Sequence, residues 1–222
     1  MDTGPLHLPR LKALDPRGPL TTAMLHDHED NLLIHQWGMI NEPVYNMQAT
    51  AYLLRDEPKP AIRAFYSMMA CAFSHSVFEP VEHRWGWGQY FGPPSTDGAW
   101  FELYRNMLLN ELSGDSLFVG QAIPRAWLAD GKQVRASGAP THFGPVNLMF
   151  TSEAAKGIIH VAVEFRSDRR PPTLLVRLRH PEAKPLQSVT VNGRRWAGFD
   201  AVREWVRIDA PQAARYDITA HY

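Results

Sequence analysis

The segment from Glu79 to Phe91 concentrates side chains that can do chemistry. It holds two carboxylates, an imidazole, a guanidinium, an amide and four aromatic rings: Glu79, Glu82, His83, Arg84, Trp85, Trp87, Gln89, Tyr90 and Phe91. Trp and Tyr rings match the flat C–H faces of sugars, and the polar side chains match the hydroxyl rims. Cleavage of a glycosidic bond needs two carboxyl groups, one that donates a proton and one that acts as base or nucleophile. We therefore interpret Glu79 and Glu82 as candidate catalytic residues, and His83, Arg84, Trp85, Trp87, Gln89 and Tyr90 as candidate substrate-binding residues.

Each of these residues also has a structural interpretation. Glu82 and Arg84 could form an ordinary surface ion pair, Glu79 could cap a helix, and the tryptophans could fill space between two domains. Two carboxylates three residues apart in a loop are a weak signal, because either one could act with a residue that this chain lacks. The alternatives stay open for single residues, whereas the composition of the whole segment favours the wall of a sugar-binding cleft.

A second candidate segment surrounds the predicted entrance of a helix. Trp37, Glu42 and Tyr45 could face the same cleft as the first segment and bind substrate there. The structural alternative is that Asn41 caps the helix while Glu42 interacts with its positive end.

Metal and cofactor chemistry find little support in the sequence. His26, His28 and the neighbouring acids have the types of metal ligands, but no further cluster completes the set, so helix capping is the favoured interpretation and no metal site is predicted. The single cysteine, Cys71, excludes an internal disulfide and a cysteine-based zinc site. We expect no cofactor.

Composition narrows the possible partners. The 222 residues include 23 Lys and Arg and 23 Asp and Glu, so no basic excess exists to hold a nucleic acid backbone. No apolar run is long enough for a membrane helix, and the N-terminus shows no apolar region of a signal peptide. We expect a carbohydrate substrate as partner, no nucleic acid and no membrane, and assign no compartment.

Helical patterns occupy the first half of the chain. Residues 1–22 contain so many prolines that we expect a loop there. Apolar stripes over 45–53 and 62–73, joined by a short turn, predict an antiparallel helical hairpin, and a third stripe predicts a helix over 100–108. Three helices are too few to form a stable domain by themselves, which suggests that the sequence is the C-terminal part of a larger protein, with Met1 internal or the start of a gene fragment. The alternative is that the helices pack only on the sandwich or on a partner chain.

The pattern changes after Gly114 to short strands separated by turns. We expect strands at Leu117–Gln121, Gln133–Ala136, Val146–Thr151, Ile158–Phe165, Leu174–Arg179, Ser188–Val191, Trp205–Ile208 and Tyr216–His221. Asn192-Gly193, between Val189–Val191 and Arg194–Trp196, is a strong hairpin signal. Regular short strands predict a β-sandwich. In it, we expect Arg177–Pro181 to form an exposed strand face that ends in a turn.

Two strings, Ala122–Lys132 and Ala139–Pro145, together with the Val189–Gly193 turn and the preceding helices, resemble the C-terminal region of bacterial six-hairpin glycosidase-like proteins. The resemblance implies an α+β, segregated fold: the C-terminal helical hairpins of an (α/α) barrel over 1–113, followed by an antiparallel β-sandwich over 114–222. It implies that the remaining barrel helices come from a missing N-terminal part or from a partner chain.

The function that the resemblance implies is that of a glycoside hydrolase portion acting on an oligo- or polysaccharide. The catalytic acid of that group often lies in the middle of the barrel, which this sequence does not contain. Two alternatives remain open. One is a non-catalytic sugar-binding or structural module, and the other is a polysaccharide lyase in which His83 or Tyr90 serves as base beside Arg84.

Overall fold

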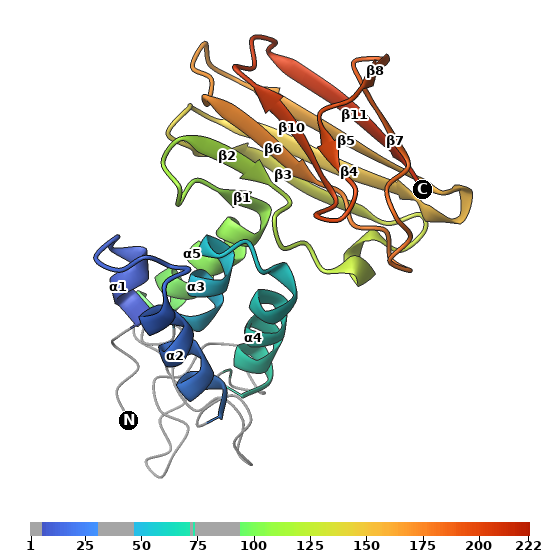
Figure 1. Ribbon diagram of the computed structural model, residues 1–222. Coiled ribbons are helices and arrows are strands. Elements are labelled where there is room, and N and C mark those ends of the chain that lie inside the picture. Colours follow the sequence, from blue (N-terminus) through green and yellow to red (C-terminus); the bar gives the residue numbers. More distant parts are fainter. Residues whose placement is uncertain (1–5, 31–46, 72, 74–93) are drawn as a thin grey trace. The chain divides into compact units, whose positions relative to one another are not determined.

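The computed structural model describes residues 6–30, 47–71, 73 and 94–222 (Figure 1). The chain separates into two compact units, Met1–Asn106 and Met107–Tyr222. The first unit is helical and the second is built from strands, and we treat each by itself. Among the described residues, no helix combines the length and the apolar character needed to cross a bilayer.

The helical unit contains two short and three longer helices. They are α1 (His7–Arg10), α2 (Pro19–His28), α3 (Gln48–Leu54), α4 (Pro58–Cys71) and α5 (Pro94–Leu108), whose last two residues belong to the second unit. The expectation of a loop over 1–22 is wrong, because α1 and the start of α2 fall there. Pro19 is the first residue of α2 and follows an extended Gly18, a position where proline costs no hydrogen bond and its fixed φ suits the helix.

The expected fold class is contradicted in this unit. The described residues contain five α-helices, of which α1 has 4 residues and α3 has 7, and two β-sheets make up much of the chain. The helices expected near 45–53, 62–73 and 100–108 exist as α3, α4 and α5, and α3 packs on α4. The amphipathic stripes were therefore sound indicators of helices, but they do not make the helical hairpins of an (α/α) barrel.

The second unit has two sheets. The strands are β1 (Leu109–Asn110), β2 (Ser116–Val119), β3 (Gln133–Ala139), β4 (Val146–Glu153), β5 (Ile158–Phe165), β6 (Thr173–Arg177), β7 (Ser188–Val191), β8 (Arg194–Trp196), β9 (Phe199–Asp200), β10 (Trp205–Asp209) and β11 (Arg215–His221). One sheet has the order β1-β2-β6-β10-β9 and the other β3-β4-β5-β11-β7-β8. Short 3₁₀ helices at Arg125–Leu128 and Ala154–Lys156 connect strands.

All eight expected strands are present, as β2 to β7, β10 and β11. The hairpin signal also pointed to Arg194–Trp196, which is β8. The strands that the sequence did not indicate, β1 and β9, have only two residues each, too few to show a period. One pairing departs from the antiparallel expectation, because β2 runs parallel to β6 with Leu117 opposite Leu174.

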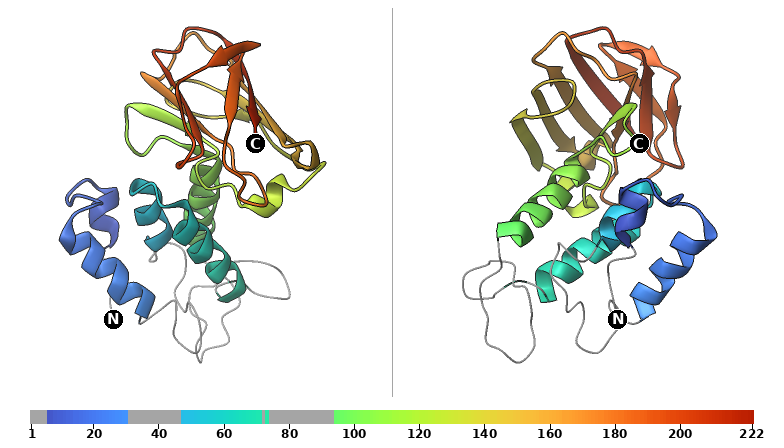
Figure 2. Two further views of the ribbon diagram at one scale, coloured as in Figure 1. Left: turned by 45° about the vertical axis from the view of Figure 1, so that its right-hand side comes forward. Right: turned by 90° about the vertical axis from the view of Figure 1, so that its left-hand side faces the viewer.

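The two sheets enclose one apolar core. Along β5, buried and partly exposed residues alternate, so Ile159, Val161, Val163 and Phe165 point inward. Side chains from both sheets form a single buried cluster, in which Phe150 is fully buried. Figure 2 shows the strands of this unit in two further views. Packing is tight at Gly120, where an added Cβ would lie 2.6 Å from Phe150 Cζ.

The turn at Asn192-Gly193 joins β7 to β8, as its sequence indicates. Both residues have positive φ, 50° and 75°, which is the backbone that a two-residue hairpin of this kind requires. Asn192 also ties the turn to β11, because the amide of Asp217 donates to its Oδ1 over 2.8 Å.

Candidate functional site

Every candidate site residue from the sequence lies outside the described residues. These are Trp37, Glu42, Tyr45, Glu79, Glu82, His83, Arg84, Trp85, Trp87, Gln89 and Tyr90. They fall in two segments, 31–46 and 74–93. The roles assigned to them therefore stay predictions, and what the structure provides is the set of helix ends to which the two segments are joined.

Those helix ends lie together at one end of the helical unit. Arg55, directly after α3, donates to Thr22 Oγ1 over 2.9 Å, so the end of α3 lies beside the start of α2. Figures 1 and 2 show that the end of α2, the start of α3 and the end of α4 point to the same side of this unit. Phe73, just beyond α4, contacts Trp100 in α5 with ring centres 4.7 Å apart. Segments 31–46 and 74–93 are thus both anchored at this end.

A polar cluster joins three of these helices. Tyr52 of α3 donates its hydroxyl hydrogen to Glu29 Oε1 over 2.5 Å, and Arg63 of α4 forms an ion pair with the same carboxylate. Burial, and next the hydrogen bond to Glu29, raise the pKa of the Tyr52 hydroxyl above its usual range. The Glu29 side chain is 21% exposed and that of Arg63 55%, so the cluster extends from the interior to the surface.

In the string of histidines and acidic residues at the end of α2, His28 packs inside the helical unit. His28 is 1% exposed and its Nδ1 lies 3.2 Å from the Met24 carbonyl oxygen, while its Nε2 has no hydrogen-bond partner in the part of the chain that the structure describes. Burial lowers the pKa of His28, so the neutral ring is favoured. Within the described ranges, no three His, Cys, Asp or Glu side chains are placed to hold a metal ion.

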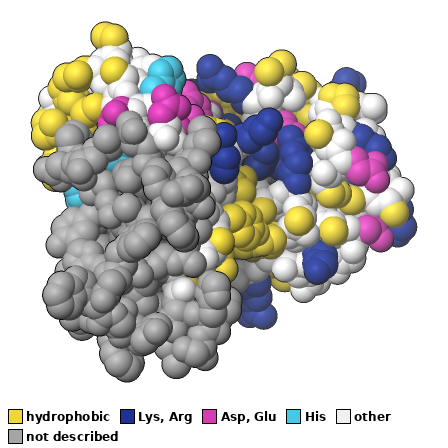
Figure 3. Space-filling model, turned by 90° about the horizontal axis from the view of Figure 1, so that it is seen from below, with side chains coloured by type: hydrophobic (Ala, Val, Ile, Leu, Met, Phe, Trp, Pro, Cys, Tyr) yellow, Lys and Arg dark blue, Asp and Glu magenta, His cyan; other side chains and the backbone are white. Residues whose placement is uncertain are grey.

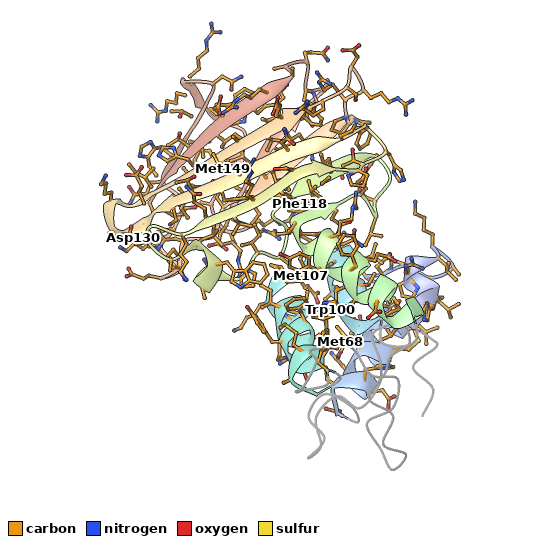
Figure 4. All side chains as sticks on the ribbon, turned by 180° about the vertical axis from the view of Figure 1, so that it is seen from behind. Met68, Trp100, Met107, Phe118, Asp130 and Met149 are labelled. Atoms are coloured by element: carbon orange, nitrogen blue, oxygen red, sulfur yellow. The ribbon has the colours of Figure 1, made fainter. Side chains whose placement is uncertain are left out.

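An aromatic cluster on α4 and α5 went unrecognised in the sequence. Phe65 stacks on Trp100 with ring centres 4.5 Å apart and planes at 15°, and it lies 6.4 Å from the ring of Tyr104. Figure 4 shows Trp100 on α5 and the buried Met68 on α4. The sequence pattern placed these aromatic residues on core stripes. It gave no sign that some of the rings reach solvent, because exposure depends on what packs beside a helix.

Exposed apolar side chains occur on both units, and Figure 3 shows one face. The large ones with high exposure are Leu8, Leu11, Leu20, Tyr66, Phe101, Tyr104, Met149 and Val202. Aromatic members of this set, Tyr66, Phe101 and Tyr104, all belong to α4 and α5.

The tryptophans of the sandwich, by contrast, have packing roles. Trp127 and Trp196 pack against the apolar core, and Trp196 donates from Nε1 to the Arg207 carbonyl over 3.0 Å. The ring centres of Trp205 and Phe118 lie 5.5 Å apart, and the Arg203 guanidinium lies 5.3 Å from the centre of the Trp205 ring. These three rings are therefore poor candidates for stacking on a sugar.

The expected exposed strand face at Arg177–Pro181 is wrong. Arg177 is 2% exposed, Arg179 7% and His180 1%, because their polar atoms find partners inside the unit. Arg177 donates to the carbonyls of Gln121 and Arg203. Paired inward, these side chains hold the end of β6 in place.

A carboxylate completes this buried arginine network. Glu204 receives a hydrogen bond from Arg125 at 2.8 Å and lies 3.5 Å from Arg179 Nε. Burial, and next the charge of Arg125, lower the pKa of Arg179. Because the arginines of this network bind backbone carbonyl groups and one carboxylate inside the unit, we assign the network a structural role.

One row of side chains on the six-stranded sheet has the residue types of a hydrolytic triad. His160 Nδ1 lies 3.0 Å from Thr219 Oγ1, and His160 Nε2 lies 3.5 Å from Glu153 Oε1. The backbone N–H groups of β5 and β11 are used in ladders on both sides, so none is available to stabilise an oxyanion at this position. The row is a cross-strand polar ladder on a flat, partly exposed face.

Comparison with known proteins gives a weak result. No model of a protein family matches the chain, and no curated protein matches it. One solved structure, described as "Glycoside hydrolase", is similar with a TM-score of 0.40 and 11% sequence identity, over 83% of this chain and 33% of that one. The chain spans about a third of that structure's length. At this TM-score the likeness carries neither a fold assignment nor a function.

Proposed function

We propose that this chain is part of a carbohydrate-active enzyme that hydrolyses glycosidic bonds, with Glu79 and Glu82 as its carboxyl pair. The observation that supports the proposal is the joint anchoring of segments 31–46 and 74–93 at one end of the helical unit. Between them, these segments hold every Trp, Glu, His, Arg and Gln that the sequence singles out for sugar chemistry. A site assembled from them would combine both segments around one ligand.

The chemistry assigns a role to each residue type. One of Glu79 and Glu82 protonates the leaving oxygen while the other acts as base or nucleophile. Trp85, Trp87 and Tyr90 stack on sugar rings. The remaining candidates supply hydrogen bonds to hydroxyl groups or further contacts to the ring faces: Trp37, Glu42, Tyr45, His83, Arg84 and Gln89.

The single variants Glu79→Gln and Glu82→Gln of the full chain test this assignment. Each removes a titratable proton and keeps the size and polarity of the side chain. We expect release of reducing ends from the polysaccharide substrate to fall by about 100-fold or more, while retention in a gel containing that polysaccharide stays unchanged. Glu182→Gln is the matched control, because Glu182 is an exposed sandwich residue whose carboxylate lies 3.0 Å from Lys184 Nζ.

Three results would contradict the proposal in different ways. Wild-type turnover in both variants would remove the two carboxylates from the mechanism. Products with a double bond, detected by ultraviolet absorbance, would identify a lyase. Binding of a polysaccharide by the wild-type chain without any turnover would identify a non-catalytic sugar-binding module.

A further inference from the structure

One end of the sandwich unit carries exposed arginines from two connections between strands. The loop after β5 contains Arg166 and Arg169, and the β7–β8 turn is followed directly by Arg194 and Arg195. All four residues are exposed. Within the part of the chain that the structure describes, their guanidinium groups form neither a hydrogen bond nor an ion pair, and we call these four residues the arginine edge.

The start of β11 lies between the two connections. Phe165, the last residue of β5, donates from its backbone N–H to the Ala214 carbonyl over 2.8 Å, so the loop after β5 begins beside the first residues of β11. On the other side, the amide of Asp217 donates to Asn192 Oδ1 over 2.8 Å, which holds the β7–β8 turn against the same end of β11. From β5 through β11 and β7 to β8 there are three strand spacings, or roughly 14 Å. The arginine edge is therefore too wide for one small anion to reach all of its members.

The acidic side chains at this end leave most of the arginine edge uncompensated. Three of the four acids already have a partner at 2.7 to 2.9 Å: Asp217 with Arg215, Asp209 with Arg207, and Glu164 with Asn147. The fourth, Asp168, balances at most one of the four arginines. Lys and Arg also outnumber Asp and Glu in the whole sandwich unit, whereas the acids are in excess in residues 1–106. The sandwich unit therefore has the charge that attracts an anionic ligand.

We propose that the arginine edge binds the carboxylate groups of a uronate-containing polysaccharide. A planar guanidinium donates two parallel hydrogen bonds to one carboxylate, a geometry that the ammonium group of lysine cannot provide. No lysine occurs in the β5–β6 connection or in the β7–β8 hairpin. A polymer with carboxylates on successive sugars can contact arginines that are roughly three strand spacings apart.

This inference deepens the proposed function and rests on it, because it names an acidic polysaccharide as the substrate class. It assigns binding to the sandwich unit and leaves bond cleavage to Glu79 and Glu82. Loss of the arginine edge would therefore weaken binding of the polymer and leave kcat unchanged.

The test is affinity electrophoresis of the full chain in native gels that contain polygalacturonate, alginate or neutral dextran, each compared with a gel without polymer. We expect at least one of the two uronate polymers to retard the wild type, and dextran to leave its mobility unchanged. Because each exposed pair contributes modestly, the double variants Arg166→Gln/Arg169→Gln and Arg194→Gln/Arg195→Gln should each lose about fivefold in affinity, and the quadruple variant about 20-fold. Retardation should also fall between about 0.05 M and about 0.5 M salt, because the attraction is screened.

Lys132→Gln/Lys184→Gln is the matched control, because it removes the same charge as each double variant from exposed residues at the opposite end of the sheet. Far-ultraviolet circular dichroism verifies that each variant is folded. A wild type that neither uronate polymer retards would overturn the proposal, as would a quadruple variant that is retarded like the wild type or a lysine control that loses as much affinity as the arginine variants. Release of the bound protein by an equal mass of double-stranded DNA would also overturn it, because the ligand would then be a nucleic acid.

Two sets of variants separate this inference from the catalytic assignment. Glu82→Gln should be retarded normally and show no turnover, whereas the arginine variants should be retarded less and keep their kcat. Normal turnover in both Glu79→Gln and Glu82→Gln, together with retardation that depends on the arginine edge, would overturn the catalytic pair alone.

Discussion

The two units of this chain use their aromatic residues in different ways. In the sandwich, Phe150 and Phe165 are 0% and 3% exposed and belong to one closed core. In the helical unit, Phe101 is 67% exposed and Tyr66 41%, although both lie on amphipathic helices. In the sandwich, Phe150 and Phe165 are buried in the core and stabilise it, whereas the helical unit has several aromatic rings at its surface.

Buried polar groups occur in both units. In the sandwich, Arg125 and Arg179 converge on Glu204, and carbonyl groups accept further hydrogen bonds from both arginines. Among the described residues, Arg179 Nε in the sandwich and His28 Nε2 in the helical unit are buried without a hydrogen bond. A buried nitrogen of this kind costs free energy of folding, so neither unit is free of this cost.

The largest expected effect is the loss of a core ring in the sandwich. Phe150→Ala should lower the free energy of unfolding by about 3 to 5 kcal/mol, because it removes a fully buried ring and leaves a cavity beside Gly120. Urea unfolding followed by tryptophan fluorescence measures the change. Met149→Ala is the control one residue away, where a side chain 39% exposed should cost about 0.5 kcal/mol. Equal costs for the two variants would mean that the sandwich core is not the source of stability described above.

A smaller effect should appear in the helical unit on acidification. Because burial lowers the pKa of His28, the unfolded chain binds a proton at a higher pH than the folded chain does. The unit should therefore keep its full stability above the ordinary histidine pKa of about 6.5 and lose stability as the pH falls below it. His28→Leu should flatten this dependence in urea unfolding at pH 7 and pH 5. His142→Gln, at a side chain 80% exposed, serves as control. The same pH dependence in wild type and His28→Leu would refute the assignment.

The smallest expected effect is at the exposed ring of Phe101 in α5. Phe101→Ala should change the free energy of unfolding by no more than about 0.5 kcal/mol, because most of the ring is already in water. The same substitution at Phe150 is the comparison, measured in the same urea titration. A cost of several kcal/mol at Phe101 would show that the ring is structural, and would remove the contrast between the units.

Local sequence patterns predicted the strands well and the helical architecture badly. β5 and β7 have the expected bounds, because period-two alternation and turn residues act over a few positions. The same kind of pattern identified α3, α4 and α5 but could not say how they assemble, and the expected barrel is contradicted. An apolar stripe indicates that a helix packs against another element of the structure. Which element this is depends on contacts between distant parts of the chain.

Burial of charged residues was the second failure. Arg177, Arg179 and His180 alternate with apolar residues at a strand end, which in the sequence is typical of an exposed face. They are buried because Glu204, the Gln121 carbonyl and the Ile123 carbonyl come from far along the chain to meet them. A pairing across 25 to 56 residues leaves no trace in local spacing.

The sequence by itself determined the types of the longer elements, the Asn192-Gly193 hairpin and the two segments rich in Trp and Glu, since each depends on neighbouring residues only. The tertiary structure decided which strands share a sheet, that β2 runs parallel to β6, that three arginines and one glutamate meet in the sandwich, and that Phe101 faces water while Phe150 does not. The physical reason is that burial and pairing are properties of contacts between residues that are distant in the sequence.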